Sequence, residues 1–357
     1  MPVPPIGRRQ FITAAGGTLF CTLSGHRMSA NSHVSMAGME RLGAEVPVPP
    51  LVRAADSDDQ PHATFVSATA HAAQGTGQIR EYWIRAERTH WNIVPTHRDG
   101  MMNARVPGRS TFTALAYRAY SPNFAAPLGP ATIPGPLLEA QTGDTIVVNF
   151  RNETGAPVTM HPHGIFYTSD MDGAYKGAYT TPGGFVQNKR TFQYVWEAHP
   201  GTEGSWFYHD HGPLDPVPVF KGLFGPLIIR PAGAPVPDTE FFLTLHSFIP
   251  LATGLDNSFS CINGRAYADN TPTLRAQVGQ SVAFHVFALD DDFHAFHLHG
   301  HRWVDPGGDL VIDTKVLGPG DTMTAEFIED NPGRWFYHCH VFSHLHMGMN
   351  GWYIVSP

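Results

Sequence analysis

The chain has 357 residues, of which 42% are hydrophobic and 15% charged, so it can form the cores of two ordinary domains and is not a disordered chain. Its formal net charge of −8, together with the absence of a basic run, argues against a nucleic-acid partner. The 36 glycines and 31 prolines indicate many turns and few long helices, which favours an all-β fold.

The N-terminus has the layout of an export signal. Arg8 and Arg9 precede a weakly apolar stretch at residues 11–23, and small residues follow. This layout predicts a twin-arginine signal over residues 1–30 and an exported protein, periplasmic or extracellular. The alternative is a chance arginine pair in a disordered start. The apolar stretch is too short to span a bilayer, and no later segment reaches the necessary length, so we expect no membrane anchor.

The chain then changes from polar sequence to strand-like sequence. Residues 31–59 are mixed, polar and proline-containing, and we expect them to be disordered. Strand-like runs follow, for example at residues 79–86, 111–117 and 145–151, each with Gly, Pro or Asn nearby. These runs support the all-β prediction.

Two blocks of the sequence resemble each other. Residues 206–211 (WFYHDH) match residues 335–340 (WFYHCH). An internal duplication of one β-sandwich explains this match. We therefore predict a first domain over residues 60–230, a proline-rich linker over residues 231–238, and a second domain over residues 239–357.

The histidines are the anomaly of this composition. The chain has 21 of them, and about half fall in four tight groups. Histidine is the commonest metal-binding side chain, so the grouping predicts metal centres. A single such pair is usually an ordinary surface or core feature, but four groups at these spacings are not. The groups are His161 and His163; His209 and His211; His294, His297 and His299; and His338, His340 and His344.

The last group has a definite geometry. In a β-strand, residues i and i+2 share a face and the residue between them points the other way. His338 and His340 therefore face one side of the strand, and Cys339 faces the other. One tripeptide can serve two metal centres, with only a few covalent bonds between the thiolate and either imidazole.

The surroundings of Cys339 match a mononuclear blue-copper site, which uses two His, a Cys thiolate and a weak axial Met. His344 and Met349 lie in the same loop, and His294 can come from a neighbouring strand. Zinc is a poor alternative, because the eight remaining imidazoles with no thiolate match no usual zinc site. A disulfide between Cys261 and Cys339 is conceivable in an exported protein, but the blue-copper use is favoured.

Together these motifs resemble the four copper-binding signatures of multicopper oxidases, and most closely those of the bacterial two-domain (small) laccases, over residues 130–357. The resemblance implies two cupredoxin-like Greek-key β-sandwich domains and four coppers per active site. The implied ligands are His294, Cys339, His344 and Met349 for the type 1 copper; His161 and His297 for the type 2 copper; His163, His209 and His340 for one type 3 copper; and His211, His299 and His338 for the other.

The first block lacks a blue site of its own. Asp210 stands where Cys339 stands in the second block. Copper nitrite reductases differ, since they keep the blue-site Cys in the first domain and need only three His for the catalytic copper. Each domain supplies half of the eight cluster histidines, so the resemblance implies a homotrimer with clusters at subunit interfaces. Closure within one chain is the alternative, although the short linker at residues 231–237 makes it awkward.

Three residues beyond the ligands are candidates for catalysis. Reduction of dioxygen to water consumes four protons, so acids near the cluster are expected. By resemblance, Asp172 and Asp313 match acidic positions and Tyr167 matches a tyrosine that acts as a reserve electron donor. The alternatives are a turn or salt-bridge role for each aspartate and a packing role for the tyrosine. We expect these histidines to be structural: His199, His246, His285, His301 and His346.

The predicted function is laccase-like: one-electron oxidation of phenols and aromatic amines, coupled to four-electron reduction of dioxygen to water. Electrons would pass through Cys339 to His338 and His340. One rival is an oxidase of Cu(I), Mn(II) or Fe(II), although the Met-rich insert of cuprous oxidases is absent. The other is a copper store or electron carrier, which would leave the eight cluster histidines without a purpose. The role of the long segment at residues 90–130 stays open.

Overall fold

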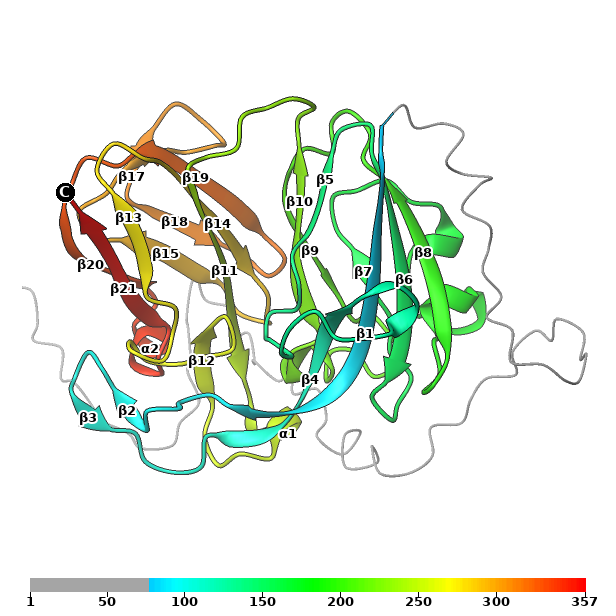
Figure 1. Cartoon of the computed structure of the whole chain (residues 1–357). Coiled ribbons are helices and arrows are strands. Elements are labelled where there is room, and N and C mark those ends of the chain that lie inside the picture. Colours follow the sequence, from blue (N-terminus) through cyan, green and yellow to red (C-terminus); the bar gives the residue numbers. More distant parts are fainter. Residues whose placement is uncertain (1–76) are drawn as a thin grey trace, which may run out of the picture. The chain divides into compact units, whose positions relative to one another are not determined.

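The computed structural model describes residues 77–357 (Figure 1). The predicted export signal at residues 1–30 and the predicted disordered segment at residues 31–59 lie outside the described residues, so both stay predictions. Within the described part of the chain, no helix is long and apolar enough to cross a bilayer.

The fold is all-β, as the composition predicts, with two β-sandwiches in sequence order (Figure 1). The first sandwich has one sheet of order β4-β1-β6-β8 and one of order β5-β10-β9-β7. Its strands are β1 (Ile79–Asn92), β4 (Thr111–Tyr120), β5 (Leu138–Gln141), β6 (Thr145–Glu153), β7 (His161–Pro162), β8 (Thr191–Glu197), β9 (Gly204–His209) and β10 (Phe224–Arg230).

The second sandwich repeats this arrangement, with sheets of order β12-β11-β14-β19 and β13-β21-β20-β15-β18. The parallel pairs β1–β6 and β5–β10 recur as β11–β14 and β13–β21, so the duplication extends from sequence to topology. Its strands are β11 (Thr239–Phe248), β12 (Phe259–Ile262), β13 (Leu274–Gln277), β14 (Ser281–Ala288), β15 (His294–Leu298), β18 (Thr314–Leu317), β19 (Thr322–Ile328), β20 (Gly333–Cys339) and β21 (Asn350–Ser356).

Short elements complete the described chain. Two small hairpins are β2 (Arg98–Asp99) with β3 (Ala104–Arg105), and β16 (Trp303–Val304) with β17 (Val311–Ile312). The helices are α1 (Pro250–Thr253) and α2 (Phe342–His346), and the 3-10 turns are η3 (Pro122–Phe124), η4 (Ser169–Met171), η5 (Gly177–Tyr179), η6 (Pro182–Gly184) and η7 (Val219–Lys221).

Burial patterns explain why these sequences form strands. In β4 the alternate residues Phe112, Ala114 and Ala116 are buried, as expected of a strand with one covered face. Strand β14 is buried along almost its whole length. Its Phe284 packs in the core of the second sandwich, and its Phe287 packs in a core shared by both sandwiches. The sheet that contains β14 therefore lies between two hydrophobic layers.

A segment at residues 93–110, which we call the strap, leaves β1 in the first sandwich and runs along the second (Figure 1). Ile93 accepts a hydrogen bond from the amide of Ala266, and the amide of Gly100 donates to the carbonyl of Ala268. At the end of β1, the Trp91 indole donates to a backbone carbonyl of the second sandwich over 2.6 Å. The part of the chain whose role the sequence left open thus joins the two sandwiches.

Candidate metal centres

The predicted blue-copper residues come together at one end of the second sandwich. Cys339 ends β20, His294 begins β15, and His344 lies in α2. The Cys339 Sγ is 3.9 Å from His294 Nδ1 and 3.7 Å from His344 Nδ1, and all three side chains are buried. One ligand atom from each lies within 4.8 Å of the others. This donor set fits a blue copper.

The electrostatics at this site favour a thiolate. Burial alone would raise the pKa of Cys339, but hydrogen bonds from His294 and His344 outweigh it and lower this pKa to about 6. The thiolate is the form that binds metal. The sulfur is therefore in its ligating form at neutral pH. Burial alone would lower the pKa of His294, but its hydrogen bonds to Asp290 and Cys339 outweigh burial and raise this pKa to about 9, so metal binding there displaces a proton.

Two aspartates orient these imidazoles from behind. Asp290 Oδ1 is 3.0 Å from His294 Nε2, and Asp292 Oδ2 is 3.4 Å from His344 Nε2. Because a carboxylate engages the Nε2 of each ring, the Nδ1 of each ring is left facing the sulfur. Hydrogen-bond partners commonly orient metal-binding imidazoles in this way. The two aspartates differ in exposure, since the Asp290 side chain is 3% exposed and that of Asp292 58%. Sequence analysis missed both, although the run of three aspartates just before His294 was a visible signal.

Met349 is held beside this site by its backbone. Its amide donates to the carbonyl of His344, and its carbonyl accepts from the amide of Cys339, both over 3.0 Å. Its side chain is fully buried in the core cluster that includes Cys339. The axial role of its thioether stays a prediction. Cys261 is also buried, and neither cysteine is in a disulfide in the described structure.

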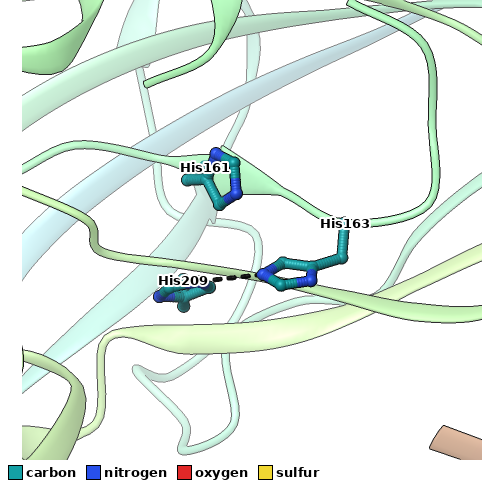
Figure 2. A group of neighbouring side chains, drawn as sticks. All are labelled: His161, His163 and His209. Atoms are coloured by element: carbon teal, nitrogen blue, oxygen red, sulfur yellow. Dashed lines mark hydrogen bonds between the residues drawn. The ribbon is translucent and has the colours of Figure 1, made fainter. Parts of the chain in front are cut away.

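A second group gathers on the first sandwich. His161 lies in β7, His163 follows β7, and His209 ends β9, and Figure 2 shows the three rings converging. The Nε2 atoms of His163 and His209 are 3.1 Å apart, and ligand atoms of all three lie within 4.8 Å of one another. The ring of His211 is 5.3 Å from that of His161. We call these four residues the first half-cluster.

The second sandwich carries an equivalent group. His297 of β15, His299 after it and His338 of β20 have ligand atoms within 4.8 Å of one another. The Nε2 atoms of His299 and His338 are 3.2 Å apart, which repeats the His163–His209 distance in the other sandwich. The ring of His340 is 5.6 Å from that of His297. We call these four residues the second half-cluster.

Backbone carbonyls determine which nitrogen of these rings is free. His161 Nδ1 donates to the carbonyl of Asp172 over 2.6 Å, and His297 Nδ1 donates to the carbonyl of Asp313 over 2.8 Å. A carbonyl can only accept, so Nδ1 carries the proton and Nε2 keeps its lone pair for a metal. His209 and His338 are set in the same way by the carbonyls of Asp210 and Cys339.

Burial keeps several of these rings neutral. Burial, together with a smaller contribution from neighbouring imidazoles, lowers the pKa of both His163 and His338 to about 4. Neutral imidazole is the form that binds a metal. Both half-clusters therefore offer lone pairs at neutral pH, which fits copper.

Two glycines let the chain turn tightly after the ligands. Gly164 follows His163 with φ of +70°, and Gly300 follows His299 with φ of +73°, where other residues are strained. A Cβ at Gly164 would collide with the ring of Trp206, and one at Gly300 would collide with a tryptophan of the second sandwich. Only glycine fits at both positions.

The three predicted catalytic residues lie beside the half-clusters. Asp172 Oδ1 is 3.1 Å from His161 Nδ1, and its Oδ2 accepts a hydrogen bond from Lys176 Nζ over 2.7 Å. The Tyr167 ring is 5.8 Å from that of His161. Asp313 is more remote, with Oδ1 3.9 Å from the ring nitrogen of its histidine and a side chain 58% exposed. Their catalytic roles stay predictions.

Four of the five histidines expected to be structural have polar partners of their own: His199, His246, His285 and His301. His301 pairs with buried Glu329 over 2.9 Å, and His285 pairs with Glu240 over 2.9 Å. His246 accepts a hydrogen bond from a backbone amide. None of the four belongs to a metal-type group among residues 77–357.

The two half-clusters are separate within the described chain. Their ligand atoms form distinct groups, one on each sandwich. The first lies on the sheet that contains β9, and β9 contacts β14 and β19 of the second sandwich. The second lies on the opposite sheet, with β15 and β20. The sheet β12-β11-β14-β19 therefore stands between them (Figure 1).

Comparison with known proteins identifies the family of the chain. Multicopper oxidase family models match residues 130–234 and 244–357. A probable nitrite reductase–hydroxylamine oxidoreductase fusion protein of Kuenenia stuttgartiensis is 31% identical over 245 residues, covering 63% of this chain and 28% of that protein. Ferroxidase HEPHL1 of Mus musculus is 27% identical over 344 residues, covering 78% of this chain and 29% of that protein. The chain thus spans less than a third of the length of these relatives.

A solved structure described as a multicopper oxidase has 25% sequence identity and a TM-score of 0.62, covering 78% of this chain and 89% of that one. Its likeness extends over both sandwiches, and the two family models together match more than half of the chain. With two cupredoxin domains and histidine and cysteine groups that fit copper, the chain belongs to the multicopper oxidase family, whose members are copper-binding oxidoreductases that use oxygen.

Proposed function

We propose that this multicopper oxidase acts as a laccase, oxidising phenols and aromatic amines one electron at a time and reducing dioxygen to water. The observation that carries the proposal is the arrangement of three consecutive residues at the end of β20. Cys339 faces the imidazoles of the blue site, while His338 and His340 on either side of it face the second half-cluster. One site for electron uptake is thereby joined to another for dioxygen.

The bound copper ions and the protein residues would have separate roles. Bound copper would supply one-electron transfer at the first site and dioxygen reduction at the second. The Cys339 sulfur is a few covalent bonds from either neighbouring imidazole. A hydrogen bond of 2.9 Å from His338 Nδ1 to the carbonyl of Cys339 provides a second connection between the same two residues. Asp172 is positioned through His161 to hold a proton beside the first half-cluster.

The complete metal centre would have one type 1 copper at the blue site and one type 2 and two type 3 coppers at the cluster, four in all. The distances within each half support this grouping. His163 with His209, and His299 with His338, are the pairs with Nε2 atoms about 3 Å apart, and each pair is assigned to one type 3 copper. The type 2 pair, His161 and His297, is a matched pair across the two halves, since the Nδ1 of each donates to the carbonyl of an aspartate at least eleven residues further along the chain.

Each cluster is proposed to form between two copies of the chain, in a homotrimer. The separation of the half-clusters by an intervening sheet supports this assembly. Exposed apolar side chains lie beside the second half-cluster: Val316 of β18 is 61% exposed, and Phe342, whose ring is 5.6 Å from that of His340, is 67% exposed. Light scattering of the copper-loaded protein tests the homotrimer, and a fully active monomer would contradict it.

The donor class follows from the surface around the blue site. Phe293, next to the ligand His294, is 51% exposed and can contact an aromatic ring. The exposed carboxylate of Asp292, 3.4 Å from His344 Nε2, can accept the proton that a phenol releases. The same carboxylate also favours a second candidate, oxidation of Fe(II), because carboxylate oxygen suits a hard cation. The ferroxidase name of one relative agrees with that candidate.

An oxygen electrode with a donor panel tests the proposal. We expect dioxygen uptake with 2,6-dimethoxyphenol at a higher rate than with Fe(II), Cu(I) or Mn(II); the reverse order would identify a metal oxidase. Cys339→Ser should lose the blue absorption and donor oxidation while keeping cluster copper. Cys261→Ser, at the other buried cysteine, is the matched control and should keep both. If no donor supports dioxygen uptake, the protein is not an oxidase, and a copper store or electron carrier is the remaining function.

A further inference from the structure

The strap is fastened to the loop at residues 263–273, which connects β12 to β13 and which we call the β12–β13 loop. Asn270 of this loop makes most of the contacts. Its Oδ1 accepts hydrogen bonds from the amide and the hydroxyl of Thr96 over 2.9 and 2.8 Å, and its Nδ2 donates to a backbone carbonyl of the strap over 2.9 Å. The amide of Gly100 donates to the carbonyl of Ala268 over 3.0 Å. Side-chain and backbone bonds therefore hold the strap against the loop.

The backbone of the β12–β13 loop is strained. Asn263, Tyr267 and Asp269 have φ angles of 51°, 69° and 72°, in the left-handed region that residues other than glycine rarely occupy. Such conformations persist only where the surrounding structure enforces them. The strap lies directly against this part of the loop, since a Cβ on Gly100 would collide with the carboxylate of Asp269. The shape of the loop thus depends on its neighbours, and the strap is one of them.

The other side of the β12–β13 loop is bonded to the segment at residues 339–349, which carries three of the proposed blue-copper ligands and which we call the copper loop. The amide of Tyr267 donates to the carbonyl of Gly348 over 2.7 Å. The fully buried side chain of Asn350 makes a second connection. Its Oδ1 accepts from the amide of Ala268 over 2.9 Å, and its Nδ2 donates to a backbone carbonyl of α2 over 3.0 Å. These bonds hold the copper loop from outside.

Ala268 is common to both sets of bonds. Its carbonyl accepts from the strap, and its amide donates to Asn350. The carbonyl that Asn350 in turn bonds is that of Leu345, which follows the proposed ligand His344 in the chain. The strap is therefore three hydrogen bonds away from the copper loop's own backbone, and a shift of the strap can reach that loop through one residue.

We propose that the strap is a positioning element for the blue site, acting through Ala268 and Asn350. Ligand geometry and access of water are two of the properties that set the reduction potential of a blue copper. Because the strap begins in the first sandwich, the geometry of the blue site then depends on how the two sandwiches are joined. The inference rests on the proposed blue-copper assignment. It adds residues that bind no metal and hold the site from a distance.

Two substitutions loosen the strap without altering the copper loop. Asn270→Ala removes three hydrogen bonds with the strap, and its partly exposed position allows the change without a buried cavity. Gly100→Ala pushes the strap away, because the added methyl group would collide with the carbonyl of Ala268. The matched controls are Asn188→Ala, which removes a hydrogen bond at an exposed asparagine of the first sandwich, and Gly129→Ala, where the methyl group meets no atom within 4 Å.

The first measurement uses the copper-free protein and needs no activity. Iodoacetamide alkylates Cys339 only when the copper loop opens, because this side chain is fully buried. We expect peptide mass spectrometry to show alkylation of Cys339 severalfold faster in Asn270→Ala and Gly100→Ala, and at the wild-type rate in both controls. Cys261, which is buried in β12, reports general unfolding and should be alkylated at an unchanged rate.

The second measurement is the reduction potential of the blue copper in the loaded protein, followed by redox titration of its absorption. We expect the potential to fall in the two strap variants, because water that enters a loosened site stabilises the more highly charged Cu(II) state. The copper hyperfine splitting in the electron paramagnetic resonance spectrum should change in the same variants. A strap that only stabilised the fold would leave both properties of the folded protein unchanged.

The proposal is overturned if the strap variants keep the Cys339 alkylation rate or the reduction potential of their controls. It is also overturned if Cys261 and Cys339 are alkylated faster by the same factor, which would indicate general unfolding. A copper-loaded wild type without the blue absorption would refute the blue-copper assignment. The alkylation rates of the copper-free variants would still decide whether the strap holds the copper loop.

Discussion

Replacement of Glu240 by Gln should weaken the junction of the two sandwiches. Glu240 in β11 accepts hydrogen bonds from Arg230 of β10 over 2.8 and 2.9 Å, and its Oε1 is 2.9 Å from His285 Nε2 of β14. The other ring nitrogen of His285 is 2.7 Å from the Ser205 hydroxyl of β9. The Glu240 side chain is only 12% exposed. This network joins strands of both sandwiches through one carboxylate.

The magnitude follows from the pKa of Glu240. Burial raises this pKa, but the hydrogen bonds and charges of His285 and Arg230 outweigh burial and lower it from the ordinary 4.5 to about 2. At 1.36 kcal/mol for each pKa unit, the difference corresponds to about 3 kcal/mol. Solvent that reaches the network screens part of this, so we expect Glu240→Gln to lower the free energy of unfolding at pH 7 by about 2 kcal/mol.

The penalty has a defined dependence on pH. Because the folded state lowers the pKa, the carboxylate contributes its full stability above pH 4.5 and loses it as the pH falls towards 2. Urea unfolding followed by tryptophan fluorescence, at pH 7 and pH 3, measures both ends of this range. Glu326→Gln, at an exposed glutamate of β19, is the matched control and should change neither value. An equal penalty at pH 7 and pH 3 would refute the electrostatic reasoning.

Two further substitutions test the strap junction and the proton supply. Trp91→Phe removes the indole hydrogen bond to Gly264 and should lower the free energy of unfolding by about 1–2 kcal/mol in thermal or urea unfolding. The control is Trp303→Phe, which should lower it less, because the buried indole nitrogen of Trp303 has no partner in the described structure. Equal losses in the two variants would contradict a stabilising role for the Trp91 hydrogen bond. Asp172→Asn should slow reoxidation by dioxygen about 10²-fold in single-turnover measurements without slowing anaerobic donor oxidation. Asp170→Asn, at a neighbouring exposed aspartate, should slow neither, and a normal rate in Asp172→Asn would exclude its proton role.

The histidine groups could be predicted from the sequence because their geometry is local. Side chains two residues apart share a face of a strand, and this period places His338 and His340 opposite Cys339. The structure has that arrangement, with Cys339 beside His294 and the two flanking imidazoles in the second half-cluster. The all-β class was also predictable, since composition and turn residues are properties of the chain itself. The predicted strands at residues 79–86, 111–117 and 145–151 begin where β1, β4 and β6 begin and end before them.

Contacts between segments that are far apart in the chain could not be predicted from the sequence. The carbonyls of Asp172 and Asp313 set the protonated nitrogen of His161 and His297, but which carbonyl lies beside which ring depends on how loops close over a sheet. The same holds for the strap, which follows the second sandwich because Trp91 and its neighbours find partners there.

The sequence by itself determined which side chains are the candidates for binding metal, and in which local pattern, because strand periodicity and covalent order decide that. Only the tertiary structure decided that the two half-clusters lie on opposite sides of an intervening sheet, that aspartates at 290 and 292 stand behind the blue-site imidazoles, and that a cleft opens beside His163 and His209. The first and the last of these features arise from the packing of one sandwich against the other, which depends on the whole buried surface and not on any one segment. The places of the two aspartates depend on how the loop before β15 folds against α2.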